Sequence, residues 1–116
     1  MKFVHLYAGP DGLSHFKDVE VEMKPAGSRG QRSELMKATG IFFSMTSPEY
    51  DLDYHNPAHR QFVITLEGQV EITASDGTTR LFGPGDIMLA DDTTGRGHIS
   101  RAVNKKPRRA IFVTLD

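Results

Sequence analysis

The segment Phe82-Gly83-Pro84-Gly85-Asp86 is the clearest guide to the fold of this 116-residue chain. Glycines on both sides of a proline give two freely rotating positions around one fixed φ angle, which indicates a tight turn between strands. Two histidine-bearing stretches flank it, Asp53-Tyr54-His55-Asn56-Pro57-Ala58-His59-Arg60-Gln61 and Gly95-Arg96-Gly97-His98. Histidines far apart in sequence can converge inside a small β-barrel, where they hold a metal ion or move a proton.

Short strand-like runs recur on both sides of this turn. They favour an antiparallel sandwich or barrel of about ten strands, and Ser75-Asp76-Gly77 is typical of a hairpin turn. The length suits one domain, residues 1–116, with one core. The predicted strands are residues 3–8, 16–23, 40–46, 50–55, 61–66, 70–74, 78–82, 86–90, 98–103 and 109–115.

Helix signals are few. The only candidate helix is Gln31–Ala38, which Gly40 closes quickly. The preceding stretch, Lys24–Gly30, resembles a loop, so this region can equally be irregular or form a lid.

Composition narrows the class of protein. A net charge of -1 with interspersed signs gives no reason to expect nucleic acid or a membrane as a partner. The absence of cysteine excludes disulfides, thiolate catalysis and cysteine metal sites. No signal-peptide region is visible near Met1, so a cytoplasmic location is the default expectation. We interpret the basic cluster Lys105–Arg109 as a solvated turn, with an anion contact as the alternative.

Alternation along residues 61–66 predicts which side chains face inward. Gln61, Val63 and Thr65 share one face, which would line a cavity, whereas Phe62, Ile64 and Leu66 form a core or subunit interface on the other. His55 lies beside Gln61 if the two strands pair around Asn56-Pro57, and His98 begins a later strand. The polar groups of His55, Gln61 and His98 can therefore converge at one mouth of the barrel.

These segments resemble the cupins. The first cupin motif is a glycine, five residues, His-x-His, three or four residues, Glu, six residues, Gly, and His55 and Gln61 occupy its first-histidine and glutamate places. The second motif begins at Gly85-Asp86 and ends with His98 in Gly95-Arg96-Gly97-His98. The resemblance covers about 45 residues and implies an all-β jelly-roll barrel, a double-stranded β-helix with little helix. It also extends to a subgroup of small, largely uncharacterised bacterial cupins.

The motifs depart from the usual cupin ligand set of three histidines and one carboxylate. Pro57 occupies the second-histidine place, Gln61 replaces the carboxylate, and Asp91 occupies the proline place of the second motif. His59 would lie about 13 Å from His55 in an extended strand, although a turn at Asn56-Pro57 could shorten the gap. The resulting metal hypothesis uses His55, Gln61 and His98 to hold Fe, Mn, Zn or Ni, with waters completing the shell, and adds His59 as a further ligand if the turn brings it close.

A metal-free reading is the alternative. His55 and His98 would then be catalytic acid–base groups and Gln61 would orient the substrate. The resemblance implies a small-molecule enzyme of oxygenase, isomerase or lyase type, whereas a non-enzymatic ligand-binding or sensor protein is the second hypothesis. A purely structural role for the two histidines ranks third. We expect a homodimer, since a small barrel leaves many apolar strand faces uncovered.

Several flanking residues carry secondary expectations. Asp53 can orient the imidazole of His55, and Arg60 either forms a surface ion pair or meets a substrate carboxylate. The remaining expectations are structural: Asp91 and Asp92 cap the loop or pair with Arg96, Met45 and Met88 are core, Phe42 or Phe43 closes the cavity floor, His5 is exposed or at an interface, and His15 is structural.

Overall fold

The computed structural model describes all residues, 1–116, and is built almost wholly of strands. A six-stranded sheet has the order β2-β1-β10-β7-β12-β5, and a four-stranded sheet has the order β6-β11-β8-β9. The elements are β1 (Lys2–Ala8), β2 (Ser14–Glu20), β3 (Lys24–Pro25), a 3-10 helix η1 (Gly27–Arg29), β4 (Gln31–Arg32), β5 (Gly40–Thr46), β6 (Asp51–His55), β7 (Gln61–Glu67), β8 (Val70–Ala74), β9 (Thr79–Phe82), β10 (Ile87–Asp91), β11 (His98–Ala102) and β12 (Arg108–Thr114). The expected all-β class is confirmed.

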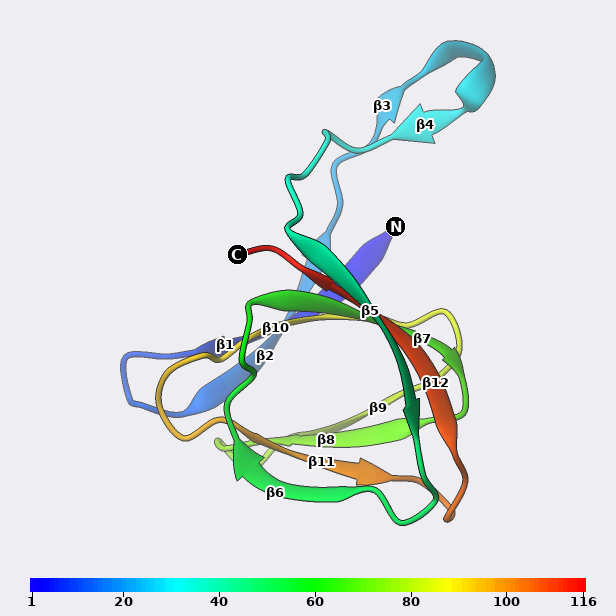
Figure 1. Cartoon of the computed structure of the whole chain (residues 1–116). Coiled ribbons are helices and arrows are strands. Elements are labelled where there is room, and N and C mark those ends of the chain that lie inside the picture. Colours follow the sequence, from blue (N-terminus) through cyan, green and yellow to red (C-terminus); the bar gives the residue numbers. More distant parts are fainter.

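The two sheets face each other and enclose the core (Figure 1). Within the six-stranded sheet β1 and β10 run parallel, whereas the other neighbours are antiparallel. Strand alternation sends one face of each sheet inward, and the inward side chains meet in a single cluster. Its buried members are Leu6, Val63, Val70, Ile72, Ala74, Phe82, Met88, Ala90 and Ala110.

The face assignment for β7 is confirmed. Val63 and Thr65 are buried, whereas Phe62 and Ile64 lie on the outer face of the sheet. The same alternation continues in β12, where Ala110 is buried and Arg109 is exposed. The inward-facing residues of these two strands therefore decide what lines the interior.

The predicted helix Gln31–Ala38 is wrong. Residues 31–32 instead form β4, which pairs with β3 in a small hairpin, and residues 33–39 have no regular structure. The hairpin extends away from the barrel (Figure 1), and Leu35 is 98% exposed. A helix of eight residues with no core to bury an apolar face is marginal in water, which explains the failure.

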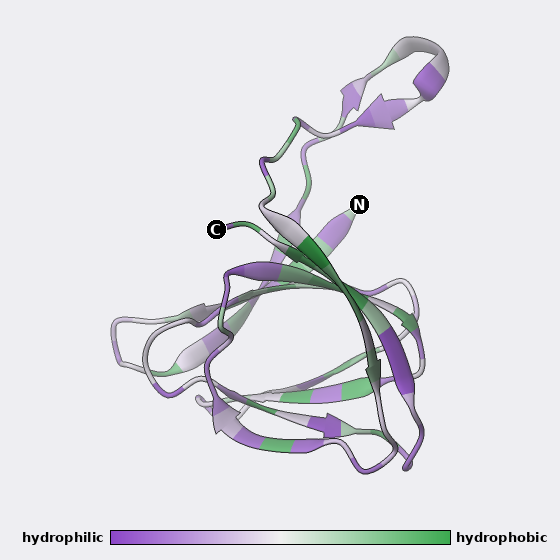
Figure 2. Cartoon of the chain, viewed as in Figure 1, coloured by the Kyte–Doolittle hydropathy of each residue, from purple (hydrophilic) through white to green (hydrophobic).

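The edge strand β5 differs from expectation. Met45 is 80% exposed and therefore is not a core residue, whereas Met88 is buried as predicted. Phe42 and Phe43 are also exposed, at 53% and 81%, so neither closes the cavity floor. The apolar colouring of β5 is visible in Figure 2 where the strand runs from the top of the barrel down its right side. The apolar side chains of β5 are therefore exposed in the single chain, and packing in its core does not account for them.

None of the helical segments has the length and apolar character required to cross a membrane.

Candidate functional site

A cavity of about 230 Å³ lies between the two sheets. Exposed Asn56 and Ala58 contribute to its wall, so it reaches the surface near the link between β6 and β7. Its lining residues are Tyr50, Leu52, His55, Asn56, Pro57, Ala58, Gln61, Val63, Ile72, Met88, Ala90, His98, Ser100, Arg108 and Phe112. The three residues expected to converge, His55, Gln61 and His98, are all among them.

His55 and His98 are cross-strand neighbours. They stand opposite each other at the paired ends of β6 and β11, and their ring centroids are 4.5 Å apart. Side chains directly opposite each other on paired strands come close enough to interact. The predicted approach of these two histidines is therefore present.

In each imidazole, Nδ1 is hydrogen-bonded to another group of the protein. His55 Nδ1 lies 2.8 Å from the backbone oxygen of Asp53, and because a carbonyl oxygen only accepts, Nδ1 carries the hydrogen. His98 Nδ1 lies 2.7 Å from Oδ2 of Asp92 and donates to that carboxylate. Neither Nε2 has a hydrogen-bond partner within the protein, so two free imidazole lone pairs belong to the cavity wall.

Asp92 is the residue that orients His98. Both side chains are buried, with relative exposures of 0% and 5%, and the second carboxylate oxygen of Asp92 has no partner. A carboxylate on Nδ1 fixes the tautomer and ring orientation of a histidine. The expectation that Asp92 pairs with Arg96 is wrong, because Arg96 lies instead over the Tyr54 ring, 4.3 Å from its centroid. Asp53 orients His55 through its backbone oxygen, not through its carboxylate.

Gly97 allows the two histidines to approach. Its φ is +79°, and a Cβ built on it would lie 2.0 Å from the backbone oxygen of His55, so only glycine fits. Asn56 holds the loop before it, because its Nδ2 is 2.9 Å from the Asp92 backbone oxygen and 3.2 Å from those of Thr94 and Gly95. Asn56 was not identified from sequence as a positioning residue.

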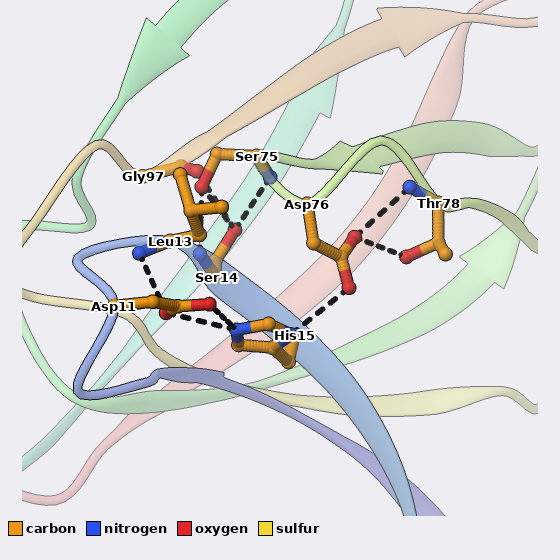
Figure 3. A network of polar contacts seen from close by, with 8 residues as sticks. All are labelled: Asp11, Leu13, Ser14, His15, Ser75, Asp76, Thr78 and Gly97. Atoms are coloured by element: carbon orange, nitrogen blue, oxygen red, sulfur yellow. Dashed lines mark hydrogen bonds and ion pairs between the residues drawn. The ribbon is translucent and has the colours of Figure 1, made fainter.

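A second polar network supports Gly97 from the other side (Figure 3). Ser14 is buried and donates from its hydroxyl to the Gly97 backbone oxygen at 2.8 Å, and its hydroxyl also accepts from the backbone N–H of Ser75 at 2.8 Å. His15 links the turn before β2 to the turn after β8. Its Nε2 lies 2.9 Å from Asp11 Oδ2, and its Nδ1 lies 3.0 Å from Asp76 Oδ2. These carboxylates raise the pKa of His15, with the hydrogen bond to Asp11 as the largest cause. His15 therefore has the expected structural role.

Gln61 reaches the cavity by a different route from that expected. β6 and β7 do not pair around Asn56-Pro57; they belong to opposite sheets, and residues 56–60 cross between them. Gln61 lies instead between Ala90 of β10 and Thr114 of β12. Its side chain therefore enters the cavity from the sheet opposite His55 and His98.

His59 is placed apart from the histidine pair. Its Nδ1 lies 3.2 Å from the backbone oxygen of Asp116, and it lines a neighbouring hollow beside Phe42 instead of the cavity. Arg60 and His5 both pair with Asp91, at 3.1 and 2.8 Å. Arg60 thus forms an ion pair, which is one of the two alternatives predicted for it. Asp91, which joins Arg60 and His5, has a structural role.

Arg108 is the main residue of the site that sequence reasoning misplaced. It belongs to β12 instead of a solvated turn, is only 4% exposed and lines the cavity. Burial lowers the pKa of its guanidinium, and Tyr50, whose ring centroid lies 5.8 Å from Arg108 Cζ, opposes that effect. Arg108, Ala110 and Phe112 alternate along β12 and share its inner face. This alternation is the sequence signal that could have predicted that Arg108 points into the cavity.

The donors present do not fit a tightly held divalent ion. No group of three or more His, Cys, Asp or Glu side chains is arranged to bind a metal, so His59 does not join His55 and His98. The two imidazoles and the amide of Gln61 supply no negative ligand. The one charged side chain other than histidine that lines this cavity, Arg108, is a cation.

Comparison with solved structures supports the fold, whereas the comparisons of sequence found no match. No protein-family model matches the sequence, and no curated protein matches it. A conserved protein of unknown function from Streptococcus pyogenes is similar in structure, with 18% identity, a TM-score of 0.54, and coverage of 72% of this chain and 69% of that one.

Two further solved structures are similar to the same degree. A cupin 2 conserved barrel domain protein from Salinispora arenicola has 20% identity and a TM-score of 0.53, over 66% of this chain and 61% of that one. A protein from Neisseria meningitidis has 16% identity and a TM-score of 0.52, over 72% and 81%. The chain therefore has a cupin-like barrel fold, as the sequence motifs implied.

Proposed function

We propose that the chain is a small-molecule enzyme that moves a proton within the barrel cavity. The observation that carries this proposal is the facing pair His55 and His98, each with Nδ1 hydrogen-bonded and Nε2 free. A neutral imidazole can act as a base or an acid near neutral pH. His98, held by Asp92, is the better oriented of the two, and it would touch the reacting atom as the base.

The reaction that fits is an isomerisation. His98 Nε2 takes a proton from a carbon of the substrate, and the C–H electron pair moves into an adjacent π system. The same proton then returns from His98 Nε2 to a neighbouring carbon, so that no oxidant or other co-reactant is needed. Gln61, on the opposite wall, would hydrogen-bond the substrate oxygen on which charge develops.

A divalent metal is not part of this proposal. Of the four metal ligands expected from sequence, His59 lies apart and contacts the backbone oxygen of Asp116. The remaining donors are neutral and share their cavity with a guanidinium.

Solvent hydrogen exchange tests the proposal. Small organic acids and ketones would be incubated with the protein in D₂O, and deuterium at carbon would be followed by proton NMR. We expect incorporation with the parent protein and its loss with His98→Gln, whereas His59→Gln, outside the cavity, keeps the rate. Ligand binding without exchange in any member of the panel would support the sensor hypothesis and overturn the enzyme proposal.

We also propose that the chain forms a homodimer through the outer face around β5. β5 is an edge strand with unpaired backbone groups, and Ile41, Phe43 and Met45 are 55%, 81% and 80% exposed. Their register neighbours in β12 include Ile111 and Val113, which extend the apolar surface across the sheet. Contiguous exposed apolar area of this kind marks an interaction surface.

Mass measurement by light scattering tests the dimer. The parent chain should have twice the mass of one chain, and Phe43→Asp should reduce it to one. Leu81→Asp is the matched control, because Leu81 is 55% exposed on β9 of the other sheet. A parent protein that is monomeric at all concentrations would reject this interface.

A further inference from the structure

Arg108 is a buried cation without an anionic partner. Its side chain is 4% exposed, its Nε has no hydrogen-bond partner, and no ion pair or hydrogen bond joins its guanidinium to any other side chain. Burying an unpaired charge is strongly unfavourable unless something compensates it. An arginine keeps its charge even when burial lowers its pKa. The barrel therefore contains a positive charge that nothing in the chain neutralises.

The neighbouring arginine shows what ordinary pairing looks like in this strand. Arg109 is exposed and bonds Glu67 through two nitrogens, at 2.8 and 2.6 Å. Arg101 similarly pairs with Asp51 at 2.8 Å. The surface arginines of these strands thus have acidic partners, whereas the one in the cavity has none.

Arg108 and the histidine pair lie towards opposite ends of one cavity. Arg108 opens β12, whereas Thr114 at the other end of that strand pairs with Gln61. Six residues of strand span about 20 Å between Cα atoms, which the long arginine side chain shortens. Ser100, buried on β11, lines the same cavity two residues from His98.

We propose that Arg108 binds the carboxylate of a small organic acid whose other end lies beside His55 and His98. This inference rests on the proposed function, since it names the substrate class of the same cavity. A guanidinium presents two parallel N–H donors that match a carboxylate, and such a pair would satisfy the orphan Nε. One guanidinium balances one negative charge, so a monocarboxylate fits better than a doubly charged phosphate.

The rest of the wall limits the body of this acid. Between the polar ends the cavity is lined by Val63, Ile72, Met88, Ala90 and Phe112, which suit an apolar chain. Its volume of about 230 Å³ is below the 300–1,000 Å³ of drug-sized pockets. The substrate class is therefore a short acid with an apolar middle and a polar or unsaturated group at the far end.

Paired ligands provide the test. Ligand-observed NMR would measure binding of short carboxylic acids, among them butyrate, 4-oxopentanoate and crotonate, and of their matching amides, with inorganic phosphate as a separate probe. The parent protein should bind at least one acid about tenfold or more tightly than its amide, because a charge-assisted hydrogen bond is lost in the amide. Equal binding of acid and amide, tighter binding of phosphate, or binding of no acid would each overturn the inference.

Three variants make the result specific to Arg108. Arg108→Gln should abolish the preference for acid over amide, and Arg109→Gln, one residue away but exposed, should retain it. Thermal unfolding without ligand should show Arg108→Gln folded and no less stable than the parent, since an unpaired buried charge is removed. If Arg108→Gln keeps the preference, the inference is wrong.

His98→Gln separates this inference from the proposed function. It should bind the same acid with its preference over the amide intact while losing hydrogen exchange. Acid binding that survives alongside unchanged exchange would contradict the role of His98 and leave that of Arg108 standing.

Discussion

His98 Nδ1 lies 2.7 Å from Asp92 Oδ2, and both side chains are buried beside the cavity. This contact joins the start of β11 to the loop that precedes it. It presents the opposite nitrogen, Nε2, as the free one.

Asp92→Asn should weaken both stability and activity. The amide is neutral, and its NH₂ group would be buried without an acceptor, which costs about 1–3 kcal/mol of the free energy of unfolding. Loss of the carboxylate that fixes the tautomer of a catalytic histidine costs up to about 10⁴-fold in rate. Denaturant titration and the rate of hydrogen exchange measure the two effects. Unchanged values for both would show that the pair is incidental.

Gly97→Ala should prevent the two histidines from approaching. The new Cβ would lie 2.0 Å from the His55 backbone oxygen at a φ of +79°, so we expect a loss of more than about 3 kcal/mol in stability. Gly77→Ala is the matched control, because Gly77 has φ +95° with no atom within 4 Å, and it should lose only about 1–2 kcal/mol. Equal losses in thermal unfolding would mean that the contact with His55 is unimportant.

His15 should give stability a defined pH window. The hydrogen bond with Asp11 raises the pKa of His15 above 6.5 and lowers that of Asp11 below 3.8. A raised histidine pKa stabilises the fold fully below the unfolded value and loses that contribution as pH rises through the folded value. A lowered aspartate pKa gives the reverse on acidification.

The difference in Tm between the parent and His15→Gln should therefore be largest between these limits, near ~pH 5.5, and shrink towards ~pH 8.5. Lys17→Gln, on the same strand, controls for a change in net charge. A difference in Tm that is constant over this range would contradict the pairing.

Protein purified without chelators should contain far less than one equivalent of Fe, Mn, Zn or Ni per chain. The reason is that the cavity offers two imidazoles, one amide and a guanidinium, with no carboxylate turned to a metal. Elemental analysis of the parent and of His98→Ala measures this. Near-stoichiometric metal in the parent that disappears in the variant would restore the metal hypothesis.

Much of the barrel is predictable because its strands carry local signals. The bounds of β5 and β8 coincide with the predicted ones, and the turn residues around Gly85 mark the start of β10. The approach of His55 to His98 also follows from the family motifs. In contrast, the pairing of strands within each sheet is non-local, so local signals could not show that β6 and β7 belong to different sheets.

Two of the errors concern burial. Arg108 follows the exposed residues Lys105, Lys106 and Pro107, and only the register of β12 against β5 and β7 turns it inward. Met45 and Phe43 have core-like side chains, but their place on an edge strand turns them outward. Side-chain type thus predicts burial poorly where a single residue of register decides the face.

Nitrogen-15 NMR of the histidine side chains tests the central claim most directly. The account predicts that both His55 and His98 carry their hydrogen on Nδ1 in the free protein, and that both Nε2 signals shift when the tightest-binding carboxylic acid is added. A hydrogen on Nε2 of either residue in the free protein, or Nε2 signals unmoved by saturating acid, would contradict it.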